Sequence, residues 1–299
     1  MEKEYLIYDI NCSECTNSEK YIKGGRIMKL LKKISAVALA ATIAVGSVFV
    51  ANPKEAYAAT SCKKVLKQNV TYKYDIDGDG DLDTIKVYKS SGDLKLKVNS
   101  CIKTLIYDYD PDYHFEITTK IYDFNKHDKS KEIFFEWVGP SDGQIRLLKF
   151  KNSTCKVNRT FQGNIGGKLN SYDPDTGIVT FRETSYGIYS KFYNAIGSFV
   201  CYPKVKVNGY TVTNQKTANT SSMVRKNKYI AAKTLTAYTS TSGTKKAFTI
   251  STGSPAYVYA LYQNGSSRYV KVKNKYGKYG YVKAGSTLLF KRSSCLWMQ

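Results

Sequence analysis

The chain beyond residue 60 consists of short runs in which apolar and polar residues alternate. Segments such as TIKVY at 84–88 and SRYVKVKN at 267–274 place every second side chain on one face, which is the period of a β-strand. Long runs with the spacing of an amphipathic helix are hard to find in this part. The 26 tyrosines, with many threonines, valines and isoleucines, also favour strands. The pattern therefore predicts an all-β protein.

Strand-like segments are most evenly spaced near the C-terminus. Five of them, separated by turn residues, are KTLTAYTS, TSGTKKAFTI, SPAYVYALYQNG, SRYVKVKN and KYGKYGYVKAG. Short strands at such spacing are typical of a small barrel, which we expect at residues 225–292. The stretch before it is rich in Thr, Asn and Ser and predicts a linker at 201–224. Residues 61–200 form the other domain in this interpretation.

The first 58 residues have a different character. Three lysines at 29–33 precede an apolar run at 34–50, and small residues follow up to Ala58. This order is typical of a secretory signal peptide, so residues 28–58 predict an N-terminal signal helix that is cleaved after Ala58. An uncleaved membrane anchor is the alternative. We expect the polar residues 1–27 to be untranslated or disordered, and the mature protein to be secreted or cell-wall-associated without stable membrane insertion.

Between residues 74 and 88 the sequence YDIDGDGDLDTIKVY carries five aspartates at alternate positions. Alternate carboxylates on a tightly turned loop can converge on one hard cation such as calcium, and the two glycines permit the backbone angles of such a turn. An EF-hand is excluded because its twelfth loop position is Lys86 rather than glutamate, and a strand pattern follows. The alternative is an acidic turn without an ion. The sequence favours a calcium loop within β structure, with the ligands Asp75, Asp77, Asp79, Asp81 and Asp83, of which Asp81 offers its carbonyl oxygen.

Three Tyr-Asp dipeptides, which begin at residues 74, 122 and 172, lie 48 and 50 residues apart, and each is next to a strand-like segment. Self-similarity at the near-constant spacing of these three copies suggests β repeats. The second copy, YDFNKHDKSKEIFFEW, keeps the strand but has Lys129 and Lys131 at ligand positions, and only Asp128 could rescue a weak metal site. In the third copy, YDPDTGIVTF, Pro174 and Gly177 predict a hairpin turn with a structural role.

The first of these motifs, YDIDGDGDLDTIKVY, resembles the calcium loops of integrin-type FG-GAP or VCBS repeats, which form blades of β-propellers. The resemblance implies that calcium binds here and that the surrounding strands form propeller-like sheets. Three copies are too few for a closed ring of roughly four to eight blades. We therefore expect an incomplete propeller-like or open β-repeat region.

Positive charge is concentrated in the second half of the chain. Residues 59–183 contain 20 Lys and Arg and 18 Asp and Glu, whereas residues 184–299 contain 18 Lys and Arg and no acidic residue. A surface with this charge attracts a polyanionic partner. For an exported protein we expect that partner to be an anionic cell-wall polymer rather than nucleic acid, which would require the same charge in another compartment.

The order of the five C-terminal segments resembles a bacterial SH3 (SH3b) domain, and GKYGYVKAG at 277–285 matches its closing segment. The sequence departs from the family where LTAY replaces the usual L-N-V-R and where Tyr281 replaces the commoner tryptophan. The resemblance implies an SH3-like barrel that binds cell-wall peptides. Strand pleating separates the core positions Val270 and Val272 from the opposite face. The expected aromatic and basic ligand surface consists of Tyr269, Lys271, Lys273, Lys278, Tyr279 and Tyr281.

Recognised catalytic motifs are absent from the sequence: it has no nucleophile elbow, no zinc-protease helix and no phosphate-binding loop, and it contains two histidines. We therefore expect a secreted, envelope-associated, non-enzymatic binding protein with structural calcium and a basic wall tether. The alternative is a wall- or glycan-acting enzyme or inhibitor whose active module is N-terminal. Spacing does not determine the disulfide pairing in the exported chain, which has an odd set of cysteines: Cys62, Cys101, Cys155, Cys201 and Cys295.

Overall fold

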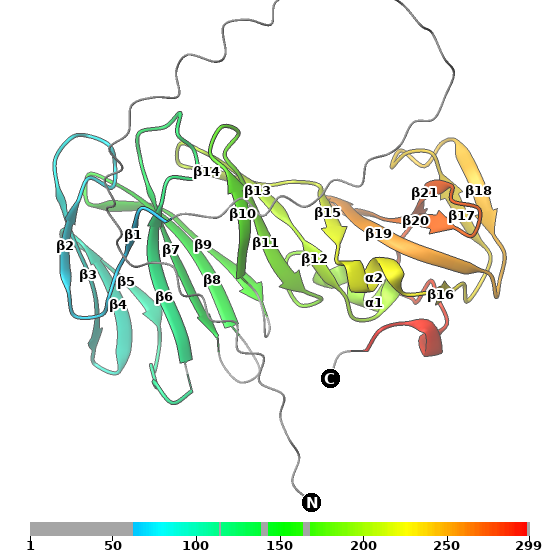
Figure 1. Ribbon diagram of the computed structural model, residues 1–299, viewed down its shortest axis with the longest axis horizontal. Helices are drawn as coiled ribbons and strands as arrows, with labels where there is room; N and C mark the ends of the chain where they lie inside the picture. Colours follow the sequence, from blue (N-terminus) through cyan, green and yellow to red (C-terminus); the bar gives the residue numbers. More distant parts are fainter. Residues whose placement is uncertain (1–61, 114, 139–142, 164–167, 298–299) are drawn as a thin grey trace, which may run out of the picture. The chain divides into compact units, whose positions relative to one another are not determined.

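The computed structural model describes residues 62–113, 115–138, 143–163 and 168–297, and most of them lie in β-strands (Figure 1). The prediction of an all-β protein is confirmed. The expected signal helix at 28–58 and the residues before it lie outside the described residues. Within the described part of the chain, no helix has both the length and the apolar character needed to cross a membrane.

The aspartate loop belongs to a four-stranded antiparallel sheet with the order β2-β3-β4-β5. Each strand pairs with the next along the chain, so the sheet is a meander. Buried and half-buried residues alternate along most of β3, because one face of the sheet packs against apolar side chains. The strands are β2 (Thr71–Tyr74), β3 (Asp83–Ser90), β4 (Asp93–Val98) and β5 (Cys101–Ile106).

A five-stranded antiparallel sheet follows, with the order β1-β6-β7-β8-β9. Its inner strand β8 is buried from Ile145 to Phe150 because both faces are covered. Leu148 and Phe150 pack in a cluster shared with the four-stranded sheet, while Ile145 and Leu147 pack in a cluster shared with β11 and β13. The strands are β1 (Lys64–Val65), β6 (Phe115–Tyr122), β7 (Glu132–Val138), β8 (Gly143–Lys151) and β9 (Thr154–Gly163).

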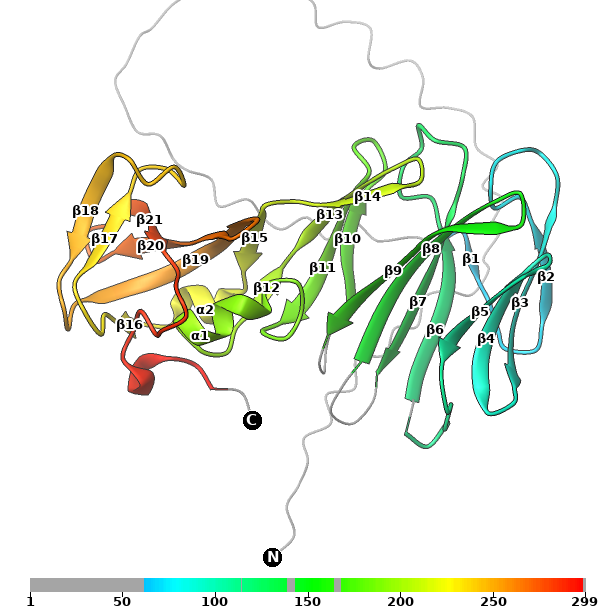
Figure 2. The same ribbon diagram turned by 180° about the vertical axis from the view of Figure 1, so that it is seen from behind.

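The remaining strands form one twelve-stranded sheet, seen from behind in Figure 2. Short helical turns lie between some of them: η1 (Ser190–Phe192), α1 (Tyr193–Ile196), α2 (Ser222–Lys226) and η2 (Arg292–Ser294). The strands are β10 (Lys168–Asp173), β11 (Ile178–Thr184), β12 (Val200–Tyr202), β13 (Lys204–Asn208), β14 (Thr211–Asn214), β15 (Thr217–Thr220), β16 (Tyr229–Ile230), β17 (Leu235–Tyr238), β18 (Lys246–Ile250), β19 (Pro255–Asn264), β20 (Ser267–Asn274) and β21 (Tyr279–Lys283).

The expected linker at 201–224 is instead part of this sheet and contains β13, β14, β15 and most of α2. Val205 and Val207 are fully buried, and β15 pairs with both β12 and β19. In β15 the buried positions are Ala218 and Thr220, which are small and only weakly apolar. The strand therefore has the composition of a linker although it is paired on both sides.

The five segments expected to form a barrel become β17 to β21. Their pairing gives an open path, β19-β20-β21-β17-β18, rather than a closed ring. Among the described residues, β18 pairs only with β17, and the other edge of β19 is taken by β15 and β16. The strands were predicted correctly, but their pairing does not close the expected barrel.

Candidate functional site

The aspartate loop connects β2 to β3 and is anchored by Ile76, which is fully buried. The N–H of Ile76 donates to Asp83 Oδ2 at 3.0 Å, and the carbonyl oxygen of Ile76 accepts from Lys131 N at 2.8 Å. Gly78 and Gly80 have φ values of 76° and 98°, a region that favours glycine. These features fix the loop between the strand ends and turn its carboxylates toward one another.

Three of the five predicted ligands come together in this loop. One carboxylate oxygen from each of Asp75, Asp77 and Asp83 lies within 4.8 Å of the other two. Asp75 accepts from Gly78 N at 2.7 Å, and Asp77 accepts from Asn152 N at 2.8 Å, so backbone N–H groups hold both carboxylates in place. Asp83 is buried, and its Oδ1 accepts from the Asn99 amide.

The other two predicted ligands lie outside this group. Asp79 and Asp81 are both exposed, and Asp79 accepts from the N–H of Asp81 at 2.8 Å. Asp79 therefore stabilises the turn through its own backbone neighbour instead of joining the triad. The prediction for Asp81 concerned its carbonyl oxygen, which this grouping of carboxylates does not test.

The triad has the chemistry of a hard-cation site. Calcium takes oxygen ligands at about 2.3–2.6 Å, so two ligands on opposite sides of the ion lie roughly 5 Å apart. The 4.8 Å limit among the three oxygens allows one ion to contact all of them. In the described part of the chain, no lysine or arginine forms an ion pair with Asp75, Asp77 or Asp83. The residues present therefore fit calcium, and none of the described lysines or arginines takes its place.

The second Tyr-Asp loop is built in the same way but contains a lysine. The N–H of Phe124 donates to Glu132 Oε2 at 2.8 Å, which reproduces the bond from Ile76 to Asp83 in the first loop. Lys149 Nζ lies 2.6 Å from Glu132 Oε1 and 3.2 Å from Asp128 Oδ1, and the Lys149 and Glu132 side chains are completely buried. Asp128 was predicted as the residue that could rescue a weak metal site, but it binds this ammonium group instead.

Lys131 also compensates negative charge in the second loop, because its Nζ lies 3.3 Å from Asp123 Oδ2. Burial raises the pKa of Glu132, and the nearby Lys149 ammonium opposes that shift. Lys149, which comes from β8, was not among the predicted site residues. Its only signal was a lysine between Leu148 and Phe150 in an otherwise apolar run.

The third Tyr-Asp loop is the tight turn between β10 and β11. Asp173 accepts from the Thr176 hydroxyl at 2.7 Å, and Gly177 has a φ of 69°. Hydrogen bonds from Thr176 and from the Asp175 N–H lower the pKa of Asp173. The hairpin turn was predicted correctly.

Part of the predicted basic surface forms on β20 and β21. Lys271 Nζ lies 5.4 Å from the centre of the Tyr279 ring and 5.9 Å from that of Tyr281. Lys273 Nζ lies 5.7 Å from the Tyr279 ring centre and 5.9 Å from that of Tyr259. The rings of Tyr259 and Tyr279 meet edge to face at 5.0 Å. We call these five residues the basic tyrosine surface.

Two predicted members do not belong to this surface, and one member was not predicted. Tyr269 is only 7% exposed and packs against Tyr262, so it cannot present its ring to a large ligand. Lys278 is exposed in the turn between β20 and β21, where its N–H donates to Asn274 Oδ1. Tyr259 joins the surface at an irregularity between Val258 and Ala260 in the pairing of β19 with β20, which strand alternation alone does not reveal.

No family model, curated protein sequence or solved structure matches this chain.

Proposed function

We propose that this chain is a secreted, envelope-associated binding protein without catalytic activity. A structural calcium ion holds its N-terminal β region, and the basic tyrosine surface tethers it to anionic wall polymers. The observation that carries the calcium assignment is the contrast between two loops of the same design. The second loop neutralises its buried carboxylates with Lys149, whereas the described residues supply no such partner to Asp75, Asp77 and Asp83.

Electrostatic repulsion among the carboxylates supports a bound cation in the first loop. Two carboxylates with oxygens within 4.8 Å of each other repel by on the order of 3 kcal/mol or more at an effective dielectric constant of about 20. Backbone N–H groups offset part of this repulsion, and calcium would remove it. Extracellular calcium is abundant enough that a Kd of roughly 10⁻⁴ to 10⁻³ M suffices. At ten times the Kd, binding adds about 1.4 kcal/mol to the free energy of unfolding.

Thermal unfolding of the mature protein tests the calcium site. We expect saturating calcium to raise the Tm by about 3–6 °C, which is the shift that 1.4 kcal/mol produces in a chain of this size. Asp77→Asn keeps the side-chain oxygen but loses the charge, and it should abolish most of the rise. Asp81→Asn removes the same charge from an exposed position in the same loop, and this variant should retain the rise in Tm. An unchanged Tm in calcium, or equal behaviour of the two variants, would refute the assignment.

The wall assignment is supported by the charge and composition of the basic tyrosine surface. Lys271 and Lys273 are held over tyrosine rings, so their ammonium groups are positioned beside aromatic faces. No acidic residue follows Glu183 in the sequence. A repeating anionic polymer can neutralise several of these charges at once, and such binding weakens as salt is added.

Co-sedimentation with purified bacterial cell walls, before and after extraction of their anionic polymers, tests the tether. A truncation is unsuitable because β15 and β19 share one sheet, so the full mature chain is used. We expect the Lys271→Ala/Lys273→Ala variant to lose most of the bound fraction. The matched variant Lys245→Ala/Lys246→Ala, which removes two exposed lysines outside the surface, should retain it. Equal sedimentation of both variants, or binding that survives polymer extraction, would disprove this role.

A further inference from the structure

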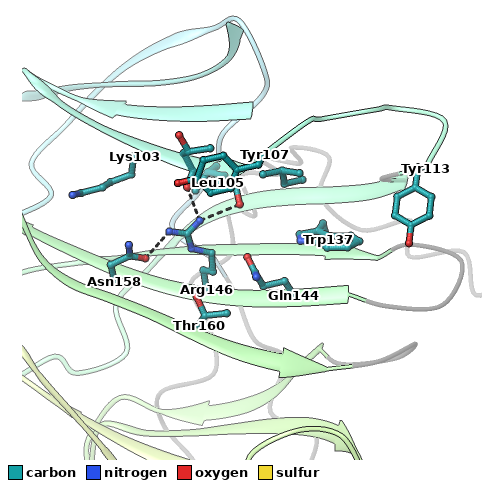
Figure 3. Close-up of a pocket in the computed structure, with 11 residues that line it drawn as sticks. Lys103, Leu105, Tyr107, Tyr113, Trp137, Gln144, Arg146, Asn158 and Thr160 are labelled. Carbon is teal, nitrogen blue, oxygen red and sulfur yellow. Dashed lines mark hydrogen bonds between the residues drawn. The ribbon is translucent and has the colours of Figure 1, made fainter. Parts of the chain in front are cut away.

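A cavity of about 600 Å³ opens between β5 and the neighbouring strands β7, β8 and β9 (Figure 3). Its size is in the range of pockets that bind small ligands. It shares no residue with the aspartate triad or with the basic tyrosine surface. The lining combines aromatic, amide and basic side chains, and none of the lining residues is acidic.

The cavity exists because one face of the five-stranded sheet changes from apolar to polar along its strands. On β8, Leu148 and Phe150 pack under the four-stranded sheet, while Arg146 and Gln144 continue the same face into the cavity. Cross-strand pairing brings Trp137 opposite Gln144, and Thr160 opposite Arg146. The alternating strands thus align a row of polar and aromatic side chains beside the apolar core.

Arg146 is the unusual residue of this cavity. It is only 8% exposed, and its guanidinium donates to the carbonyl oxygens of Thr104 at 2.6 Å and Leu105 at 3.0 Å and to Asn158 Oδ1 at 2.7 Å. Among the described residues no carboxylate pairs with it, and its Nε has no hydrogen-bond partner. Burial lowers the pKa of Arg146, yet an arginine keeps its charge in proteins. A buried cation without a counter-charge is costly, and an anionic ligand would supply that charge.

The edge strand β5 does not offer its backbone to a peptide at this point. Leu105 is the extra residue in the pairing of β5 with β4, where Ile106 faces Leu94 and Thr104 faces Lys95. Its carbonyl oxygen and that of Thr104 are already bound by Arg146. A peptide that added itself as a strand would need such backbone groups free. At this point the cavity therefore offers side chains to a ligand, and not the backbone of β5.

The two ends of the cavity differ in chemistry. Lys103, Arg146 and Asn158 lie toward one end, and Trp137 and Tyr113 lie toward the other (Figure 3). Flat aromatic rings present an apolar face, while the amide of Gln144 and the hydroxyl of Thr160 offer donors and acceptors for uncharged polar groups. This order suits a ligand that has an acidic group beside a ring with both apolar and hydroxylated faces.

We propose that this cavity binds an oligosaccharide that carries a carboxylate. The carboxylate lies at the end of the cavity that Arg146 and Lys103 line, and an adjacent sugar ring lies against Trp137. The guanidinium is already held in place by three hydrogen bonds, so binding requires little reorganisation of the cationic end. The site is independent of both the calcium loop and the basic tyrosine surface.

Isothermal titration calorimetry with two matched tetrasaccharides tests the proposal. One alternates N-acetylglucosamine with N-acetylmuramic acid and so carries a free lactyl carboxylate on every second ring, and the other is chitotetraose, which has the same backbone without carboxylates. We expect the acidic glycan to bind at least about tenfold more tightly, the effect of one charge-assisted contact. Gln144→Ala and Lys103→Ala should each weaken it, and Arg146→Met should weaken it most. Lys151→Ala removes an exposed lysine of the same strand outside the cavity and should bind as the wild type does.

Several outcomes would overturn the proposal. One is equal affinity for the two glycans. A second is no binding of the acidic glycan at millimolar concentration. A third is that tetra-alanine, a peptide carboxylate, binds as tightly as the acidic glycan. Gln144→Ala and Lys103→Ala keep the test valid if Arg146→Met does not fold. The Lys271→Ala/Lys273→Ala variant should bind the acidic tetrasaccharide normally, so failure of the wall tether and failure of this cavity are distinguishable.

Discussion

Glu183 on β11 gives the protein a stability that depends on pH. Its carboxylate is completely buried, and Oε2 accepts from Ile188 N at 2.8 Å, while Oε1 has no partner among the described residues. Burial raises the pKa of Glu183 from 4.5 to about 7, and the bond from Ile188 opposes the shift. The protonated carboxyl is therefore the form that the folded protein favours.

The sign of the effect follows from the direction of this shift. Because the folded pKa lies above the unfolded value, the contribution of Glu183 to stability is complete below about pH 4.5 and is lost as the pH rises through about 7. A difference of roughly 2.5 pKa units corresponds to about 3 kcal/mol. Glu183→Gln keeps the shape and the oxygen that accepts from Ile188, but it cannot ionise. The variant should match the wild type at pH 4 and exceed it by up to about 3 kcal/mol at pH 8.

Urea unfolding from pH 4 to pH 8, monitored by circular dichroism, measures this difference. Glu116 is exposed, so Glu116→Gln serves as the control and should stay within about 0.5 kcal/mol of the wild type throughout. A Glu183→Gln variant that is no more stable than the wild type at pH 8 would show that ionisation of the buried carboxyl does not destabilise the folded protein. The same conclusion would follow if the two curves stayed parallel over the whole range.

Two further predictions concern the neighbouring loops, and both are measured by urea unfolding at pH 7.5. Lys149→Met leaves Glu132 without its ammonium partner and should lower the free energy of unfolding by about 3–5 kcal/mol. The double variant Lys149→Met/Glu132→Gln should recover most of this loss. A loss below about 1 kcal/mol in Lys149→Met would contradict the ion pair. Gly78→Ala places a Cβ in steric conflict with Lys129 Cβ and should lower the free energy of unfolding by about 1–3 kcal/mol more than Gly80→Ala, which meets nothing within 4 Å. Equal losses of stability in the two variants would show that Gly78 does not pack against Lys129.

The sequence determined the class of structure and the position of the loops. Alternating residues predicted strands, and the Tyr-Asp dipeptides at residues 74, 122 and 172 each lie next to a strand, at the ends of β2, β6 and β10. The aspartate spacing also placed the acidic loop between β2 and β3. These features depend on backbone periodicity and turn chemistry, which act over a few residues and can therefore be read locally.

Several outcomes could not be predicted because they depend on which strands meet. Alternation proposed five ligands, four of them through carboxylates, and the loop brings the carboxylates of Asp75, Asp77 and Asp83 together while that of Asp79 lies outside this group. The resemblance to SH3b domains implied a barrel, but β15 and β16 take the edge of β19. Tyr269 has the alternation of a surface residue, yet it is buried.

Only the tertiary structure decided how charge is distributed among these sites. Lys149 reaches Glu132 because β7 pairs with β8, which sets Ile133 opposite Leu148. Arg146, on the same strand, lies at the end of the core, where no carboxylate of the described residues faces it. From sequence alone both are basic residues in an apolar run. Strand pairing makes Lys149 the partner of a buried acid and leaves Arg146 as a cation in an open cavity. Ion pairing depends on distance in space and not on distance along the chain.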